Sequence, residues 1–253
     1  MLVSDSLMKV SVLTTVYNCE NTIAKTIESV LNQTYGNIEY IIIDGASTDN
    51  TLKIVNSYIE IFNNTPGRSL RIISEKDNGM YDALNKGVAK ASGVLVGSIN
   101  ADDWYEPEAV EKMVDFYNKK HYDVAWGDLR IIKPTGKMIK KAHIGKFWTT
   151  TGWCHPAMFA KRELLEEFPY ACENMYDDFN FITTAYKAGK KIYTLNETVS
   201  NFSFGGMSTQ KNLKDTFYRI KIKYSIYRKH KMSRIYWIHC FAMEMAKYVL
   251  GSK

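Results

Sequence analysis

The first hundred residues alternate between short runs of apolar, β-branched residues and stretches whose apolar residues recur every three or four positions. The runs predict strands at residues 10–16, 38–43, 70–74 and 94–99. The stretches between them predict helices with one apolar face, formed by Ile23, Ile27, Val30 and Leu31, then by Leu52, Val55, Ile59 and Phe62, and then by Met80, Leu84 and Val88. This alternation predicts an α/β protein with a mostly parallel sheet flanked by helices.

The second half of the chain is less regular. It predicts a hairpin from residues 124–133 and 138–144, a helix from 178–188 and a strand from 191–199. Gly205-Gly206 marks a break, after which the chain becomes basic and helical. We therefore expect a main domain over residues 1–210 and a helical tail over residues 211–253.

Composition adds a charge asymmetry to this picture. The chain has 253 residues, 45% of them hydrophobic, which excludes a disordered or disulfide-stapled chain. Its net charge of +6 favours an anionic partner, which a nucleic acid, a membrane surface or a phosphorylated substrate would provide. Residues 211–234 alone carry nine Lys and Arg against one acid, and residues 1–210 have a net charge of −3. The basic character therefore belongs to the tail.

The cysteines and the apolar segments indicate the cellular compartment in which the protein is expected. The four cysteines are scattered without a C-x-x-C pair, which favours a reducing compartment over a disulfide or metal framework. The first ten residues lack the apolar core of a secretory signal, and no apolar run reaches the roughly 18 residues that a membrane span needs. We expect a cytoplasmic protein that can contact a membrane peripherally.

Acidic and amide side chains follow three of the predicted strands. Asp44 to Asp49 follows the second strand, Glu75 to Gly79 the third, and Asn100 to Asp103 the fourth. Parallel sheets bind ligands at the carboxyl ends of their strands, and converging carboxylates there favour a divalent cation, Mg²⁺ or Mn²⁺, shared with a nucleotide diphosphate. The alternative is that residues such as Thr48 and Asp49 only cap the following helices.

Other phosphate-binding signatures are absent from the sequence. It contains no G-x-G-x-x-G after the first strand and no G-x-x-x-x-G-K-[ST], which argues against a dinucleotide site and a P-loop. A sugar nucleotidyltransferase needs a glycine-rich loop after the first strand, where this chain has Thr14 to Asn18 without glycine.

Three motifs resemble those of a known family. Val10–Asn18 (VSVLTTVYN), Ile41–Thr51 (IIIDGASTDNT) and Ser98–Trp104 (SINADDW) resemble the N-terminal motifs of family 2 glycosyltransferases, which have the Rossmann-like GT-A fold. Residues 75–87 are similar to a segment of bacterial enzymes that build O-antigen and related polysaccharides. Cys154-His155-Pro156, Tyr176 to Phe179 and Gly205 to Ser208 agree with the same family, so the resemblance extends from about residue 9 to residue 209.

The resemblance implies a role for each matching residue. The nucleotide half, about 9–104, would bind a UDP-sugar, and the acceptor half, about 105–210, a glycan. The donor nucleotide would contact Thr15, Tyr17, Asp44, Asp77 and Asp102. Asp102, with Asn100, would hold the metal, while Asp103, His155 and Asp177 would approach the donor sugar or the acceptor. Asp178 matches the family's catalytic base, although His155 is equally consistent with a structural hydrogen bond and Asp177 with orienting the helix start.

One position departs from the family pattern. The D-x-D motif begins here with Asn100, a neutral ligand that should weaken metal binding and leave Asp102 as the main anchor. The Gln-x-x-Arg-Trp motif and membrane spans of processive synthases are absent, which favours a single transfer per encounter. The resemblance thus implies an inverting, metal-dependent hexosyltransferase, with a nucleotidyltransferase or a non-catalytic sugar-nucleotide-binding or scaffold module as alternatives.

The tail predicts two amphipathic helices. Apolar residues repeat at helical spacing, first Leu213, Phe217, Ile220, Tyr224 and Tyr227, and then Ile235, Ile238, Phe241, Met245 and Tyr248. A basic helix of this kind favours an anionic membrane surface, in keeping with the polyprenyl-diphosphate-linked acceptors that are common in the family. The alternative is docking of the stripes on the main domain or on a second subunit in a homodimer. Nucleic acid is disfavoured because no recognition motif accompanies the charge.

Overall fold

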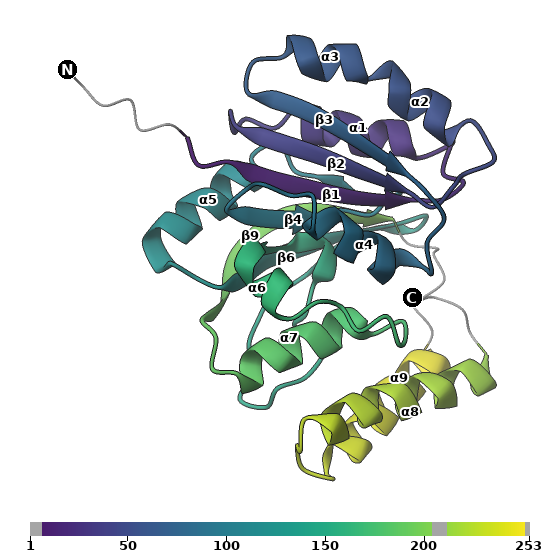
Figure 1. The fold of residues 1–253 in the computed structure, drawn as a ribbon. Coiled ribbons are helices and arrows are strands. Elements are labelled where there is room, and N and C mark those ends of the chain that lie inside the picture. The colour runs from purple at the N-terminus through teal and green to yellow at the C-terminus, as the bar shows by residue number, and fades with distance from the viewer. Residues whose placement is uncertain (1–6, 204–211, 251–253) are drawn as a thin grey trace.

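The computed structural model describes residues 7–203 and 212–250 (Figure 1). Within these ranges nine strands form one sheet in the order β3-β2-β1-β4-β8-β6-β9-β5, with β7 paired to β6. The predicted break at Gly205-Gly206 and the predicted boundary at residue 210 lie outside the described residues.

The first half of the sheet is parallel, as the strand–helix alternation predicts. It comprises β1 (Val10–Val16), β2 (Ile38–Asp44), β3 (Arg68–Ser74) and β4 (Leu95–Ser98), with all their mutual pairs parallel. Val16 pairs with Asp44 and Asp44 with Ser74, so the carboxyl ends of β1, β2 and β3 stand level. This level edge lets the loops after the three strands converge.

The predicted helices of this half form, with one difference. They are α1 (Ile23–Leu31), α2 (Thr51–Ser57), α3 (Ile59–Asn64) and α4 (Met80–Val88). The single helix predicted across Leu52 to Phe62 is divided at Tyr58, whose N–H bonds to the carbonyl of Val55, only three residues back. Val55 and Phe62 are nevertheless both fully buried, so the predicted apolar face is retained across the break.

The second half of the sheet is mixed. Its elements are β5 (Trp104–Tyr105), α5 (Ala109–Lys120), β6 (Val124–Lys133), β7 (Gly136–Lys140), the short 3₁₀ helix η1 (His155–Ala157), β8 (Met158–Lys161), α6 (Arg162–Glu167), α7 (Asp177–Lys187) and β9 (Ile192–Ser203). β6 and β7 form the predicted hairpin, although β7 ends four residues before the predicted end at residue 144. β8 runs antiparallel to both β4 and β6 and so joins the two halves.

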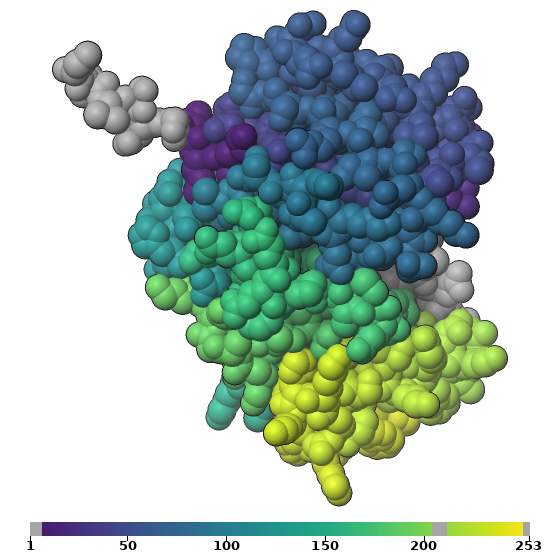
Figure 2. All heavy atoms as spheres, viewed as in Figure 1, coloured from purple at the N-terminus to yellow at the C-terminus, as the bar shows by residue number. Residues whose placement is uncertain are grey.

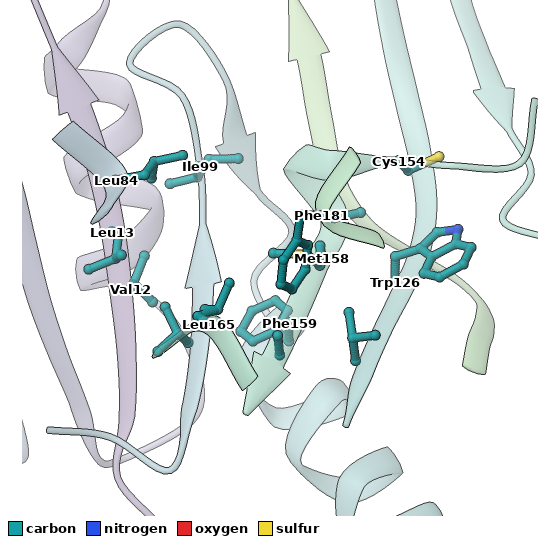
Figure 3. Packing of buried hydrophobic residues seen from close by; sticks show 14 of the residues in the cluster. Val12, Leu13, Leu84, Ile99, Trp126, Cys154, Met158, Phe159, Leu165 and Phe181 are labelled. Atoms are coloured by element: carbon teal, nitrogen blue, oxygen red, sulfur yellow. The ribbon is translucent and has the colours of Figure 1, made fainter. Parts of the chain in front are cut away.

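The junction of the halves is filled by one apolar core. Figure 3 shows Val12 and Leu13 of β1 on one side and Met158 and Phe159 of β8 on the other, all at most 1% exposed. Packing is so close that a Cβ atom on Gly97 of β4 would lie 2.6 Å from the Phe159 ring. Only glycine fits there, because real Cβ atoms do not approach another carbon this closely.

The chain ends in a helix pair at the opposite end of the molecule from α2 and α3 (Figures 1 and 2). α8 (Leu213–Lys229) packs against α9 (Tyr236–Leu250) and against α7 of the main domain. The Tyr227 and Phe179 rings meet edge to face at 5.5 Å, and His230 Nε2 lies 2.9 Å from Asn180 Oδ1. Of the two arrangements considered for the tail, docking on the main domain is therefore observed. No helix among the described residues is both long and apolar enough to cross a bilayer.

The buried face of the tail coincides only in part with the apolar stripes, since Ile220 and Tyr227 are buried. Leu213 and Phe217 of the first stripe are 45% and 50% exposed, whereas Arg219 and Lys223 are buried. α9 likewise exposes Ile238 and Tyr248 and buries Tyr236, Cys240 and Glu244, and Ile235, just before this helix, is exposed as well. Each predicted apolar stripe is buried only in part, and the two helices also pair through Glu244 and the cations around it.

This buried ion pairing predicts a pH-dependent stability. Although burial alone would raise it, the charges of Lys223 and Lys247 lower the pKa of Glu244 from 4.5 to about 2. A carboxylate whose pKa is lowered in the folded state contributes stability above its unfolded pKa and loses it as the pH falls. We expect Glu244→Gln to lower the free energy of unfolding by roughly 3–5 kcal/mol at pH 7. That difference from wild type should shrink between pH 4.5 and 2.

Denaturant unfolding of both proteins at several pH values measures the difference. Glu166→Gln is the control, because Glu166 forms an exposed pair with Arg162 one helical turn away, and such pairs contribute little. A Glu244→Gln difference that stayed constant down to pH 2 would contradict the assignment.

Candidate active site

The loop after β2 is held by Asp44. This carboxylate is fully buried and accepts hydrogen bonds from Ser74 Oγ at 2.7 Å and from Ser47 Oγ at 2.5 Å. Thr15 is half-buried on β1, and Tyr17, just beyond the end of β1, is 61% exposed. The predicted nucleotide-binding residues therefore surround one sheet edge, with Asp44 fixing the loop geometry there.

Asp77 lies against the same loop. A Cβ atom on Gly45 would be 2.7 Å from Asp77 Oδ2, so the Asp77 carboxylate lies close against the backbone of this loop. Asp77 Oδ1 also accepts from the Gly79 N–H at 2.9 Å, at the start of α4. The tertiary structure thus brings Asp44 and Asp77 together from two strand ends, as their positions in the sequence predict.

Asp49 has a local role. It accepts a hydrogen bond from the Thr51 N–H at 2.9 Å, at the start of α2. It also accepts one from the Glu20 N–H at 3.2 Å. This is the capping alternative for Asp49, and Asp77 makes the same kind of contact with the Gly79 N–H at the start of α4.

The segment from Asn100 to Asp103 is built around a buried carboxylate. Asp103 is fully buried and accepts from Asn100 Nδ2 and from the Ser203 N–H, each at 2.9 Å. Burial, and then the charge of Asp102, raise the pKa of Asp103 to about 7. Asn100 therefore supplies a donor that an aspartate at this position would lack, which gives a physical reason for its departure from the family pattern.

A divalent ion fits this segment only in part. Asp102 is exposed beside Asn100, and together they offer carboxylate and amide oxygens, the ligands that Mg²⁺ and Mn²⁺ prefer. Among the residues that the structure describes, no group of three His, Cys, Asp or Glu side chains is placed to hold a metal. An ion held here would complete its coordination with water and substrate phosphates, which is the usual arrangement for Mg²⁺.

Asp178 lies in a cavity of about 540 Å³. The cavity is bordered by Asn100 at the strand ends, by the β6–β7 hairpin, by η1 and by the tail helices. Asp178 stands in the first turn of α7, where Oδ1 accepts from Tyr81 Oη at 3.1 Å and Oδ2 from Trp153 Nε1 at 2.7 Å. Two neutral donors from different parts of the chain therefore fix a half-buried carboxylate at the cavity wall.

His155 is a mostly buried residue of the same cavity wall. It is 8% exposed, and its Nε2 lies 3.1 Å from Tyr170 Oη. Burial lowers the pKa of His155 against the opposing effect of Asp178, so the imidazole is neutral at pH 7. The contact with Tyr170 is of the structural kind, and because His155 also borders the cavity, a contact with the acceptor stays a prediction.

Asp177 is directed away from the cavity. It is fully buried and accepts from the Glu173 N–H at 2.6 Å and from the Asn174 N–H at 3.1 Å. It thereby closes the turn that begins α7 and sets the position of Asp178. Neither Asp177 nor Asp103 borders the cavity, and a contact of either with a sugar stays a prediction.

Several cavity residues were not assigned a role from the sequence. Tyr81 belongs to the similar segment 75–87, so its motif could have indicated it. Arg219, Lys223 and Lys247 line the same cavity from the tail, where the sequence suggested solvated or membrane-facing cations. Only the docking of α8 and α9 reveals them.

Comparisons with known proteins identify the family of this chain. Residues 11–237 match the model of the family described as "Glycosyl transferase family 2". A chondroitin synthase of Pasteurella multocida is 34% identical over 135 residues, a stretch that covers 53% of this chain and only 14% of the synthase. The chain therefore matches a small part of that longer enzyme.

Two solved structures have a similar fold. TarS 1–349 of S. aureus in complex with UDP-GlcNAc superposes with a TM-score of 0.73 at 19% identity, covering 97% of this chain and 74% of the other. The mannosyltransferase PcManGT of Pyrobaculum calidifontis, solved with GDP-Man and Mn²⁺, gives 0.63 at 16% identity, covering 98% and 77%. At these identities the likeness establishes the fold, which is the predicted α/β GT-A architecture, here followed by two C-terminal helices.

Proposed function

Because the chain belongs to glycosyl transferase family 2, we propose that it transfers a hexose from a UDP-sugar to a hydroxyl of a glycan acceptor in polysaccharide synthesis. The observation that carries this proposal is the position of Asp178. Its carboxylate borders a cavity large enough for sugars, and Asn100, which follows β4, borders the same cavity. The polysaccharide context is supported by the similarity to a chondroitin synthase.

The proposed reaction is a single displacement at the anomeric carbon. Asp178 accepts the proton of the acceptor hydroxyl as that oxygen bonds to the anomeric carbon. The bond from this carbon to the diphosphate oxygen breaks, and UDP leaves with the electron pair. One base without an enzyme nucleophile inverts the configuration, so an α-linked donor gives a β-linked product. A divalent ion at Asp102 and Asn100 would supply Lewis-acid stabilisation of the diphosphate charge.

A donor panel tests this function. UDP release is measured with several UDP-hexoses and UDP-N-acetylhexosamines, in the presence of glycan acceptors, with and without Mn²⁺. We expect one donor to release UDP in an acceptor-dependent manner. Pyrophosphate exchange with UTP would favour the nucleotidyltransferase alternative, and UDP binding without turnover of any donor would favour the non-catalytic module.

The outer face of the tail supports a membrane-linked acceptor. Exposed apolar side chains include Phe217 on α8 and Trp237 and Ile238 on α9, each at least 47% exposed. Basic residues share these helices, among them exposed Arg228. Apolar side chains among cations complement an anionic lipid surface, to which each basic residue near the surface adds about 1 kcal/mol. We propose that α8 and α9 contact such a surface and place the cavity near lipid-linked glycans.

Vesicle sedimentation tests the membrane contact. The wild-type protein should sediment with phosphatidylglycerol vesicles at low salt and remain in the supernatant with phosphatidylcholine vesicles. Phe217→Ser should weaken binding by about tenfold, because it removes an apolar side chain from the contact. Ile61→Ser is the matched control, since Ile61 is 47% exposed on α3, at the other end of the molecule. Equal loss in both variants, or no wild-type binding, would contradict the proposal.

A further inference from the structure

The β6–β7 hairpin borders a second cavity with its other face. In this hairpin Ile131 pairs with Met138, and both residues border the cavity that contains Asp178. Ile132 pairs with Lys137, and both of these border a separate cavity of about 560 Å³, here called the second cavity. Successive side chains of a strand point to opposite faces, so the hairpin separates the two cavities. Among the described residues, the two cavities have no lining residue in common.

One part of the second cavity is lined by a network of polar side chains. Arg130 forms an ion pair with Glu106 and also donates to Asn201 Oδ1 at 3.1 Å. Asn201 is 3% exposed and donates from Nδ2 to Glu106 Oε1 at 2.6 Å. All three residues border the cavity, and together they contain both hydrogen-bond donors and acceptors. Such a mixed set suits the hydroxyl groups of a sugar, because a hydroxyl both donates and accepts.

Two lysines, Lys25 of α1 and Lys137 of β7, border the same cavity. Lys25 Nζ lies 2.9 Å from the ring centroid of Trp104, a cation–π contact that holds this ammonium group at the cavity wall. Partial burial, and then the charge of Lys137, lower the pKa of Lys25, so the two ammonium groups lie close enough to repel each other. Neither lysine forms an ion pair with a residue that the structure describes. A ligand with negative charge would relieve this repulsion.

The two acidic residues of the second cavity bind other partners. Glu106 belongs to the polar network, and Glu28 Oε1 accepts from Tyr58 Oη at 2.9 Å. These carboxylates can accept hydrogen bonds from sugar hydroxyls, whereas they would repel the continuous phosphate charge of a nucleic acid. The cavity therefore favours a ligand that combines hydroxyl groups with separate negative charges.

We propose that the second cavity binds an acidic glycan, a sugar chain whose rings carry carboxylate or sulfate groups. Lys25 and Lys137 contact the anionic group through charge-assisted hydrogen bonds, and the polar network around Arg130 contacts the ring hydroxyls. The inference goes beyond the proposed transfer reaction, because it adds a place where this chain holds a polysaccharide outside the cavity of Asp178. Binding at this place does not require the candidate base, so binding and transfer can be measured separately.

Calorimetric titration with tetragalacturonate in metal-free buffer tests the inference. The matched probe is the methyl ester of the same tetrasaccharide, which keeps the sugar rings and loses the carboxylate charges. A sulfated carrageenan tetrasaccharide is the second charged probe, and it distinguishes sulfate from carboxylate as the anionic group. We expect at least one charged probe to bind, and the methyl ester to bind at least tenfold more weakly than tetragalacturonate if the carboxylate is the group recognised.

Variants locate the binding site. Lys25→Gln and Lys137→Gln should each weaken binding of the charged probe by about tenfold through loss of one charge-assisted contact, and Lys25→Arg should restore most of it. Lys137 is exposed, so its variant should fold even if the loss of the Trp104 contact disturbs Lys25→Gln. Lys247→Gln is the matched control, because it removes the same charge from the cavity of Asp178.

Three results would overturn the inference. The first is no binding of either charged probe, and the second is equal binding by wild type, Lys25→Gln and Lys137→Gln. The third is a loss confined to Lys247→Gln, which would place the glycan in the cavity of Asp178. Tighter binding of a single-stranded oligonucleotide at Lys25 and Lys137 would likewise assign the second cavity to a nucleic acid. Asp178→Asn should bind the charged probe as wild type does, so a failure of the proposed transfer reaction leaves this test decisive.

Discussion

Asp178→Asn is expected to lower kcat for sugar transfer by about 10²–10⁴-fold, the range for loss of a general base. The amide keeps the size of the side chain but cannot accept the acceptor's proton. UDP binding should stay within about twofold of wild type, because neither Asp44 nor Asp77 borders the cavity that contains Asp178. Steady-state kinetics and UDP calorimetry on the same preparation measure the two effects.

Two further variants make this result specific. Tyr81→Phe removes one of the two hydrogen bonds to Asp178 and retains the ring, so we expect a smaller fall in kcat, about tenfold, with little change in KM. Asp115→Asn makes the same amide substitution at an exposed site on α5 and should leave kcat unchanged. Wild-type turnover in Asp178→Asn would exclude this residue as the base.

Asp102→Ala is expected to lower kcat/KM by about a hundredfold or more, since it removes the only carboxylate proposed to anchor the ion at the diphosphate. Asn100 alone offers a neutral oxygen, and Asp103 is buried and bonded to Asn100 and Ser203. The Mn²⁺ concentration that gives half-maximal activity should therefore rise. UDP release as a function of Mn²⁺ concentration measures both quantities.

Thermal unfolding of Asp102→Ala shows whether Asp102 anchors the metal or only stabilises the fold. In Asp102→Ala the thermal midpoint should change little, because the Asp102 side chain is exposed. Asp115→Ala is again the control for removal of an exposed carboxylate. If Asp102→Ala kept the wild-type response to Mn²⁺, the ion would have to be held elsewhere.

The nucleotide half shows how far a sequence can be interpreted. β1, β2 and α1 lie where the apolar pattern predicts them, because each buries a face whose period is fixed by its own backbone geometry. The convergence of Asp44 and Asp77 follows from one general rule, that parallel strands end at a common edge. The apolar pattern did not predict the division between α2 and α3 at Tyr58, because the buried apolar face is the same with or without this division.

The surroundings of the candidate base, Asp178, could not be predicted from the sequence. The motif indicated Asp178, but its two donors, Tyr81 and Trp153, come from segments 97 and 25 residues away. Such pairs leave no periodic signal, because a hydrogen bond between distant segments depends on the path of the chain between them. Asp103 and Asp177 were singled out for the same acidic character, and only the structure distinguishes their buried, loop-holding positions from the position of Asp178 at the cavity.

The sequence by itself determined the α/β architecture, the family motifs and the net positive charge of the tail, because each is a property of local pattern or composition. The tertiary structure alone decided which face of the tail is buried. A pattern of apolar residues predicts burial only where apolar contacts are the partners available, and here Glu244 offered Arg219 and Lys223 a buried ionic partner instead. The ionic pairing brings Arg219 and Lys223 to the cavity that contains Asp178 and leaves apolar side chains such as Phe217 exposed.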